Sequence, residues 1–231
     1  MISVEKQMEI SKKMWTISMI AGIIGAVLMA ASDWMMIYGD TAYTGKLVWL
    51  TKGVLDMDPG RNALAMMLAF PAVLFYSIAL VSIRHAFKSE KERKNYTFIT
   101  ILGLTPWLCL HLFYTMIFYM ASWLHMNGYG KLACLTGEAV FEHFGWIVIA
   151  GEVFMVLPWI YLFVKTLRNR THFHRLIAFD NPLLIYVVLK CLTAFMPDRP
   201  FRLAFTNGLM SEAMIIFFII YLIFGLQMYK K

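Results

Sequence analysis

The chain has 231 residues, of which 60% are hydrophobic and 15% are charged, and its formal net charge is +7. A soluble domain usually carries about 25% charged residues, so this chain has too little polar surface to cover a compact soluble fold. The composition excludes an ordinary soluble domain, and we expect the lipid bilayer rather than a nucleic acid to be the partner of this chain.

Six apolar segments are long enough to cross a bilayer, which requires about 20 residues per helix. In chain order they are residues 14–38, 62–84, 97–125, 138–166, 175–196 and 206–228. We therefore predict an all-α, polytopic integral membrane protein in which one domain, residues 1–231, forms a six-helix transmembrane bundle.

Local signals bound the second and fifth segments. Asp58-Pro59-Gly60 predicts a turn with a helix N-cap before the second segment. Asn181-Pro182 interrupts the fifth segment and leaves only the stretch from Pro182 to Met196 as helix. At 1.5 Å per residue that stretch reaches about 22 Å, so we predict that the fifth helix is broken or tilted.

Small residues recur at every fourth position of the first segment, at Ser18, Gly22, Ala26 and Ala30. Such a row lets a second helix approach closely. We expect this contact to lie within the bundle rather than between two copies of the chain.

The basic residues divide unevenly between the connections that six spans would create. Fourteen of the 21 Lys and Arg residues lie at the chain ends and after the second and fourth segments, while six lie in the other connections and Lys190 lies inside the fifth segment. Positively charged loops stay in the cytoplasm, so we expect a plasma-membrane protein with both termini cytoplasmic. The fourteen are Lys6, Lys12, Lys13, Arg84, Lys88, Lys91, Arg93, Lys94, Lys165, Arg168, Arg170, Arg175, Lys230 and Lys231.

Seven ionisable residues fall inside the predicted spans, where each is costly unless it is paired or hydrated. In the predicted orientation they lie near the middle of the bilayer or in its outer half, and hardly any lie in the cytoplasmic half. We therefore expect a polar cavity that opens to the outer face. The seven are Asp33, His111, Glu142, His143, Glu152, Lys190 and Glu212.

Helical spacing narrows this set. At about 100° per residue, His111 and Tyr114 share one face of the third span, and Glu142 and Glu152 share one face of the fourth. We assign Glu142, Glu152 and His111 to the centre of the site as candidate catalytic groups. The candidate ligand-binding residues around them are Asp33, Tyr114, His143, Lys190, Glu212, Trp107 and Trp146.

The sequence lacks the motifs that would indicate a metal site, a serine nucleophile or a phosphate-binding loop. Neither a His-x-x-x-His nor a Glu-x-x-His pair occurs in the spans, and Cys109, Cys134 and Cys191 do not have metal-ligand spacing. The chain also lacks a Gly-x-Ser-x-Gly motif and a phosphate-binding P-loop. We expect no metal site, and the sequence does not identify a cofactor.

The remaining interpretations share a polar pocket within the bundle. We expect it to bind a small amphipathic or lipid-like ligand, with acid–base chemistry by His111 and Glu142 or Glu152 as one outcome. One alternative is a small proton-coupled transporter, which at this size would be a homodimer. Another is a non-catalytic sensor or accessory subunit. In the simplest structural reading the charged groups only pair with one another, as Glu152 and Lys190 would.

Overall fold

The computed structural model describes residues 4–38, 55, 57–197 and 200–229. Some basic residues that bear on the predicted orientation lie outside the described residues, namely Lys46, Lys52, Arg199, Lys230 and Lys231. Within the described ranges every regular element is helical, apart from one isolated bridge between Phe87 and Thr171. The predicted all-α fold is therefore confirmed.

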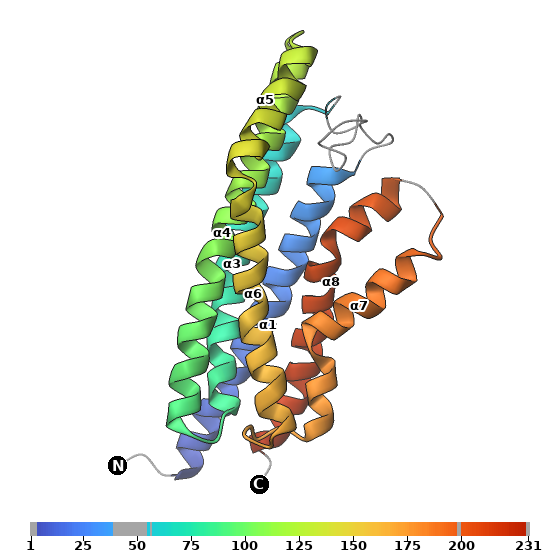
Figure 1. The fold of residues 1–231 in the computed structure, drawn as a ribbon. Coiled ribbons are helices and arrows are strands. Elements are labelled where there is room, and N and C mark those ends of the chain that lie inside the picture. Colours follow the sequence, from blue (N-terminus) through green and yellow to red (C-terminus); the bar gives the residue numbers. More distant parts are fainter. Residues whose placement is uncertain (1–3, 39–54, 56, 198–199, 230–231) are drawn as a thin grey trace.

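Seven α-helices and three short 3₁₀ helices make up this part of the chain (Figure 1). The α-helices are α1 (Val4–Ile37), α3 (Pro59–Ser82), α4 (Glu90–Met126), α5 (Gly130–Phe144), α6 (Trp146–Leu167), α7 (Pro182–Thr193) and α8 (Pro200–Gly225). The 3₁₀ helices are η1 (Ile83–Ala86), η2 (Arg175–Asp180) and η3 (Leu226–Tyr229). Five helices, α1, α3, α4, α6 and α8, are long and apolar enough to cross a membrane.

The long helices run up and down the molecule in alternating directions. Figure 1 shows the start of α1 and η3 at one end, which we call the basal end, together with the connections through η1 and η2. The opposite, distal end holds the end of α1, the α4–α5 turn and the start of α8 (Figure 1). The predicted basic connections that the structure describes therefore gather at the basal end.

The fourth predicted segment is two helices rather than one. Gly145 separates α5 from α6, and its backbone N–H bonds the carbonyl of Phe141 at 2.7 Å. A Cβ at Gly145 would clash with that same carbonyl, so a residue without a side chain is needed here. The hydropathy of residues 138–166 is continuous across this break, and the pattern gave no sign of it.

The fifth predicted segment is also shorter than expected. Asn181 caps α7 by accepting a bond from the backbone N–H of Leu183 at 3.1 Å, and Pro182 begins the helix. This confirms the predicted break and leaves α7 with 12 residues. α7 alone is therefore too short to be counted among the span-length helices, of which there are five rather than six in the described chain.

The small-residue row of α1 packs within the bundle, as predicted. A Cβ at Gly22 would lie 2.6 Å from that of Ala79 on α3 and 2.9 Å from the ring of Phe218 on α8. Ser82 also donates a 2.8 Å hydrogen bond to Ser18. These contacts draw α1, α3 and α8 into one layer.

A second layer consists of α4 and α6. Pro158 carries no N–H, so the carbonyl of Phe154 one turn earlier loses its helical partner. Gly103 of α4 packs at this carbonyl, and a Cβ there would approach it to 2.7 Å. Near the basal end Lys165 of α6 pairs with Glu92 of α4 at 3.2 Å.

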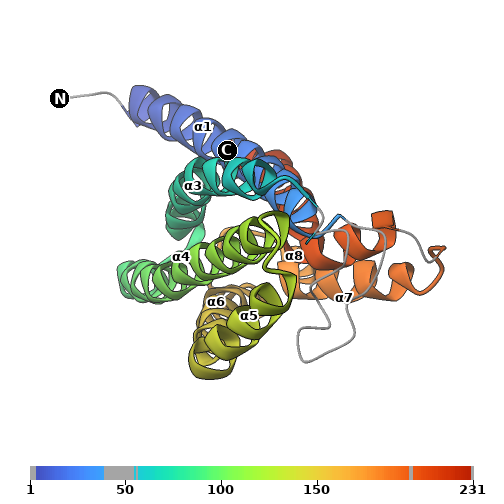
Figure 2. The same ribbon diagram turned by 90° about the horizontal axis from the view of Figure 1, so that it is seen from above.

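Buried aromatic rings fill the basal half between the two layers. They are Trp15, Phe87, Tyr96, Trp159, Phe173, Phe217, Phe218 and Tyr221. α7 joins this half through Asn181, whose side-chain amide donates to the carbonyl of Trp159 at 2.9 Å. Beyond this contact α7 slants away from α6 in both views (Figures 1 and 2).

Candidate functional site

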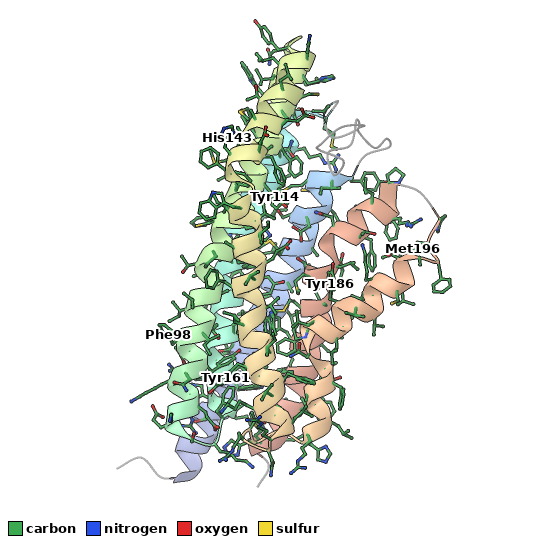
Figure 3. All side chains as sticks on the ribbon, viewed as in Figure 1. Phe98, Tyr114, His143, Tyr161, Tyr186 and Met196 are labelled. Carbon is green, nitrogen blue, oxygen red and sulfur yellow. The ribbon has the colours of Figure 1, made fainter. Side chains whose placement is uncertain are left out.

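A cavity of about 460 Å³ lies in the distal half of the bundle. Its walls come from both layers, with α4 and α6 on one side and α1, α7 and α8 on the other. In Figure 3 the labelled Tyr114 lies on the α4 side and Tyr186 on the α7 side. The divergence of α7 from α6 is what leaves room for this space between the layers.

A buried hydrogen-bonded group forms the polar wall of the cavity. Ser211 of α8 donates from Oγ to Oδ2 of Asp33 at 2.6 Å. His111 of α4 approaches the other oxygen, with Nε2 3.7 Å from Oδ1 of Asp33. Asp33 itself is only 7% exposed. One carboxylate thus connects α1, α4 and α8.

The contacts of His111 indicate where its protons lie. Its Nδ1 faces the backbone carbonyl of Trp107 at 3.2 Å, and a carbonyl can only accept, so we assign a proton to Nδ1. A neutral ring would then present an unprotonated Nε2 to the Asp33 carboxylate. At 3.7 Å this approach is longer than a hydrogen bond, so His111 and Asp33 are neighbouring ionisable side chains in the cavity wall.

A second carboxyl group stands directly behind this wall. Glu212 follows Ser211 on α8, and its Oε1 accepts a 2.7 Å bond from the indole N–H of Trp34. Trp34 in turn follows Asp33 on α1. Two consecutive residues of α1, Asp33 and Trp34, therefore bond two consecutive residues of α8, Ser211 and Glu212 respectively. Gly208 makes room for this arrangement, because a Cβ there would approach both Glu212 and Trp34 to about 3 Å.

The rest of the lining is largely apolar and aromatic. The ring of Trp107 makes edge-to-face contacts with two other rings. Its centroid lies 5.1 Å from that of Tyr76 and 4.6 Å from that of His111. Tyr114 stacks on Phe118 with 6.2 Å between ring centroids. The remaining lining residues are Met36, Ile37, Leu110, Glu152, Met155, Val156, Leu183, Tyr186, Thr206, Asn207 and Met210. The cavity therefore combines the Asp33–His111–Ser211 group with a mainly apolar and aromatic lining that also contains Glu152, Thr206 and Asn207.

Five of the residues singled out from the sequence line this cavity, namely Asp33, Trp107, His111, Tyr114 and Glu152. Glu212 does not line the cavity, but it lies close enough to Asp33 for the two carboxyl groups to interact electrostatically. The expected gathering of ionisable groups in one half of the bundle therefore holds for these residues. Their role in function stays a prediction.

Four other candidates lie outside the cavity. Glu142 and His143 belong to α5 rather than α6 and are exposed, and Figure 3 shows His143 closer to the distal end than Tyr114. Trp146, the first residue of α6, is 64% exposed. Lys190 is exposed on α7, and no ion pair joins it to Glu152 in the described structure. Glu142 and Glu152, predicted to share one helix face, lie on different helices on either side of Gly145, and only Glu152 lines the cavity.

Sequence reasoning missed Ser211, Tyr186 and Asn207. A serine in an apolar helix carries little signal, because its hydroxyl is usually satisfied within its own helix. The adjacent Glu212 was the available sign that this turn of α8 faces a polar region. Tyr186 and Asn207 gave no comparable signal. In the described part of the chain, no three His, Cys, Asp or Glu side chains gather in a way that could hold a metal ion.

These features define a class: an all-helical bundle with five membrane-length apolar helices and a cavity in one half. The chain belongs to DUF6796, a family of unknown function, because the family's sequence model matches residues 8–228. No curated protein and no solved structure matches the chain.

Proposed function

We propose that this chain is an integral membrane protein of the plasma membrane that binds a small amphipathic ligand in the distal cavity. The single observation that carries the proposal is the composition of the cavity wall, in which the Asp33–His111–Ser211 group faces an apolar and aromatic body. Ligand pockets of a few hundred Å³ usually combine such a body with a few oriented polar groups. Burial of an alkyl chain would supply affinity, and the polar group would orient the head.

The same proposal includes six passes with both termini in the cytoplasm. The alternation of helix direction in Figure 1 supports an even number of passes, and the basic residues at the basal end support a cytoplasmic location for that end. In this arrangement α7 crosses obliquely against α8, and the cavity lies in the outer half of the bilayer. The ligand then enters from the bilayer, between α6 and the diverging α7.

Photolabelling tests the binding proposal. The protein is reconstituted in phosphatidylcholine nanodiscs and irradiated with a diazirine analogue of decanol, and the labelled peptides are mapped by mass spectrometry. We expect label on α7 and α8 next to Leu183 and Met210. Met210→Trp fills the cavity and should abolish this label, whereas Met67→Trp, at a position 70% exposed on α3, should leave it unchanged. Equal labelling of the outer faces, insensitive to Met210→Trp, would contradict the proposal.

The proximity of two ionisable side chains, Asp33 and His111, in the cavity wall favours a second candidate, a carrier that couples ligand movement to protons. The aromatic core of the basal half would then be the closed side of the carrier. Proteoliposomes with an imposed pH gradient test this candidate. Proton movement that depends on an added amphiphile and is lost in Asp33→Asn would support it, and the absence of coupled movement would exclude it.

A further inference from the structure

The charges around the cavity distinguish between classes of amphiphile. Two carboxylates, Asp33 and Glu152, line the cavity, and neither Lys nor Arg is among its described lining residues. His111 is the one lining group that can carry a positive charge there. Building on the proposed function, we propose that the ligand is an amphipathic amine, in which a cationic head is joined to an alkyl or aryl body.

His111 does not reverse the balance of acidic and basic groups in the cavity wall. Even as an imidazolium it would offset only one of the two carboxylates, and the described lining residues include no lysine or arginine to offset the other. Glu152 lines the cavity from an exposed position on α6.

The aromatic lining suits the same head group. The rings of Trp107, Tyr114, Phe118 and Tyr186 all border the cavity. The face of an aromatic ring attracts a cation within about 6 Å of its centre, more strongly when water is excluded. An ammonium group can therefore contact Glu152 and aromatic faces together, which a carboxylate or phosphate head cannot do.

Basic residues elsewhere do not offset this preference. Lys190 is exposed on α7 outside the cavity, and Arg61 of α3 is directed to the backbone carbonyl of Tyr38 at 3.0 Å. An anionic head that reached the cavity would face Glu152 without a lysine or arginine in the wall. The wall therefore disfavours fatty acids and phosphate-headed lipids.

Competition against the decanol photolabel tests the inference. The competitors are decyltrimethylammonium, decanoate, unlabelled decanol and tetramethylammonium, of which the three decyl compounds are compared at equal membrane-bound concentration. We expect decyltrimethylammonium to displace the label at a concentration about tenfold lower than decanol, and decanoate to be the weakest of the three. Glu152→Gln should remove this preference, whereas Glu142→Gln, at a glutamate on α5 that is not among the lining residues, should retain it.

Failure of the inference is distinguishable from failure of the proposed function. If the cavity is labelled but decanoate or decanol displaces the probe as well as the cation does, the binding function stands and the amine is excluded. If tetramethylammonium competes as well as decyltrimethylammonium, the ligand is a water-soluble cation and the amphipathic amine is excluded. If the cavity is not labelled at all, the proposed function itself fails.

Discussion

Ser211 on α8 and Asp33 on α1 are joined by a 2.6 Å hydrogen bond from a serine hydroxyl to a carboxylate oxygen. Both residues are buried, at 3% and 7% exposure. The bond fixes the carboxylate of Asp33 so that its other oxygen faces His111. Ser211 therefore positions the polar wall of the cavity and also fastens α1 to α8.

Ser211→Ala tests this double role. The change removes a charge-assisted bond at a buried carboxylate, for which we expect a loss of about 1–3 kcal/mol in unfolding free energy. Ser77→Ala is the matched control, because Ser77 donates only to the carbonyl of Val73 in its own helix. SDS titration in mixed micelles measures both variants. Equal stability of the two would contradict the role assigned to Ser211.

His111→Ala removes the other partner of Asp33. It should weaken photolabelling of the cavity and destabilise the protein by about 1–3 kcal/mol, because the buried carboxylate loses its neighbouring imidazole. His143→Ala has the same local setting, with Nδ1 2.8 Å from the carbonyl of Ala139, but lies exposed on α5. We expect that variant to stay within about 0.5 kcal/mol of the parent. If both histidines behave alike, His111 has no special part in the wall.

Local chemistry predicted the helix boundaries that depend on a single residue. Asp58 accepts a 2.8 Å bond from the N–H of Gly60 at the start of α3, and Asn181 caps α7, both as the sequence indicated. The break at Gly145 was not predictable in this way, because glycine is common within membrane helices and the flanking residues are apolar. This break also affected the prediction of the site, because Glu142 and His143 lie on α5 and not on α6 with Glu152.

The sequence predicted those site residues whose placement in a membrane helix is energetically costly. Ionisable groups in apolar helices are expensive, so Asp33, His111 and Glu152 stood out without knowledge of the fold. Ser211 and Tyr186 did not, because hydroxyl groups and aromatic rings are tolerated at many depths. Contacts between these ionisable groups depend on how each helix is rotated and on where helices break. Rotation and breaks are set by tertiary packing, which hydropathy and residue spacing do not determine.

Substitution of Asn181 should lower the thermal stability of the protein, because this residue holds the start of α7. Its Oδ1 caps the helix and its Nδ2 donates to the carbonyl of Trp159, so one side chain performs two tasks. Asn181→Ala loses both bonds, whereas Asn181→Asp keeps the cap but places a buried carboxylate oxygen against the carbonyl of Trp159, where two acceptors repel. We expect Tm to fall in both variants, in Asn181→Ala by an amount that includes about 1 kcal/mol for the lost cap. An unchanged Tm in Asn181→Asp would show that the contact with Trp159 does not hold α7 in place.

Close packing of α1 makes Gly22 intolerant of a side chain. Gly22→Ala places a Cβ 2.6 Å from the Cβ of Ala79, and we expect a loss of about 1–3 kcal/mol from overpacking. Ala79→Gly in the same chain removes the nearest obstacle and should restore part of the stability, with Phe218 still in the way. A double-mutant cycle in SDS measures the coupling. Additive losses would mean that Gly22 and Ala79 do not touch.

The orientation of the bundle is testable with single cysteines at its two ends. In a variant whose three native cysteines are replaced by alanine, Lys131→Cys lies at an exposed position of α5 at the distal end, and Arg168→Cys follows α6 at the basal end. Both changes remove one basic residue, so each serves as the control for the other. A membrane-impermeant maleimide should label Lys131→Cys in intact cells and Arg168→Cys only after permeabilisation, because the more basic end stays in the cytoplasm. The opposite pattern would place the cavity in the cytoplasmic half of the bilayer. Its ligand would then enter from the inner leaflet.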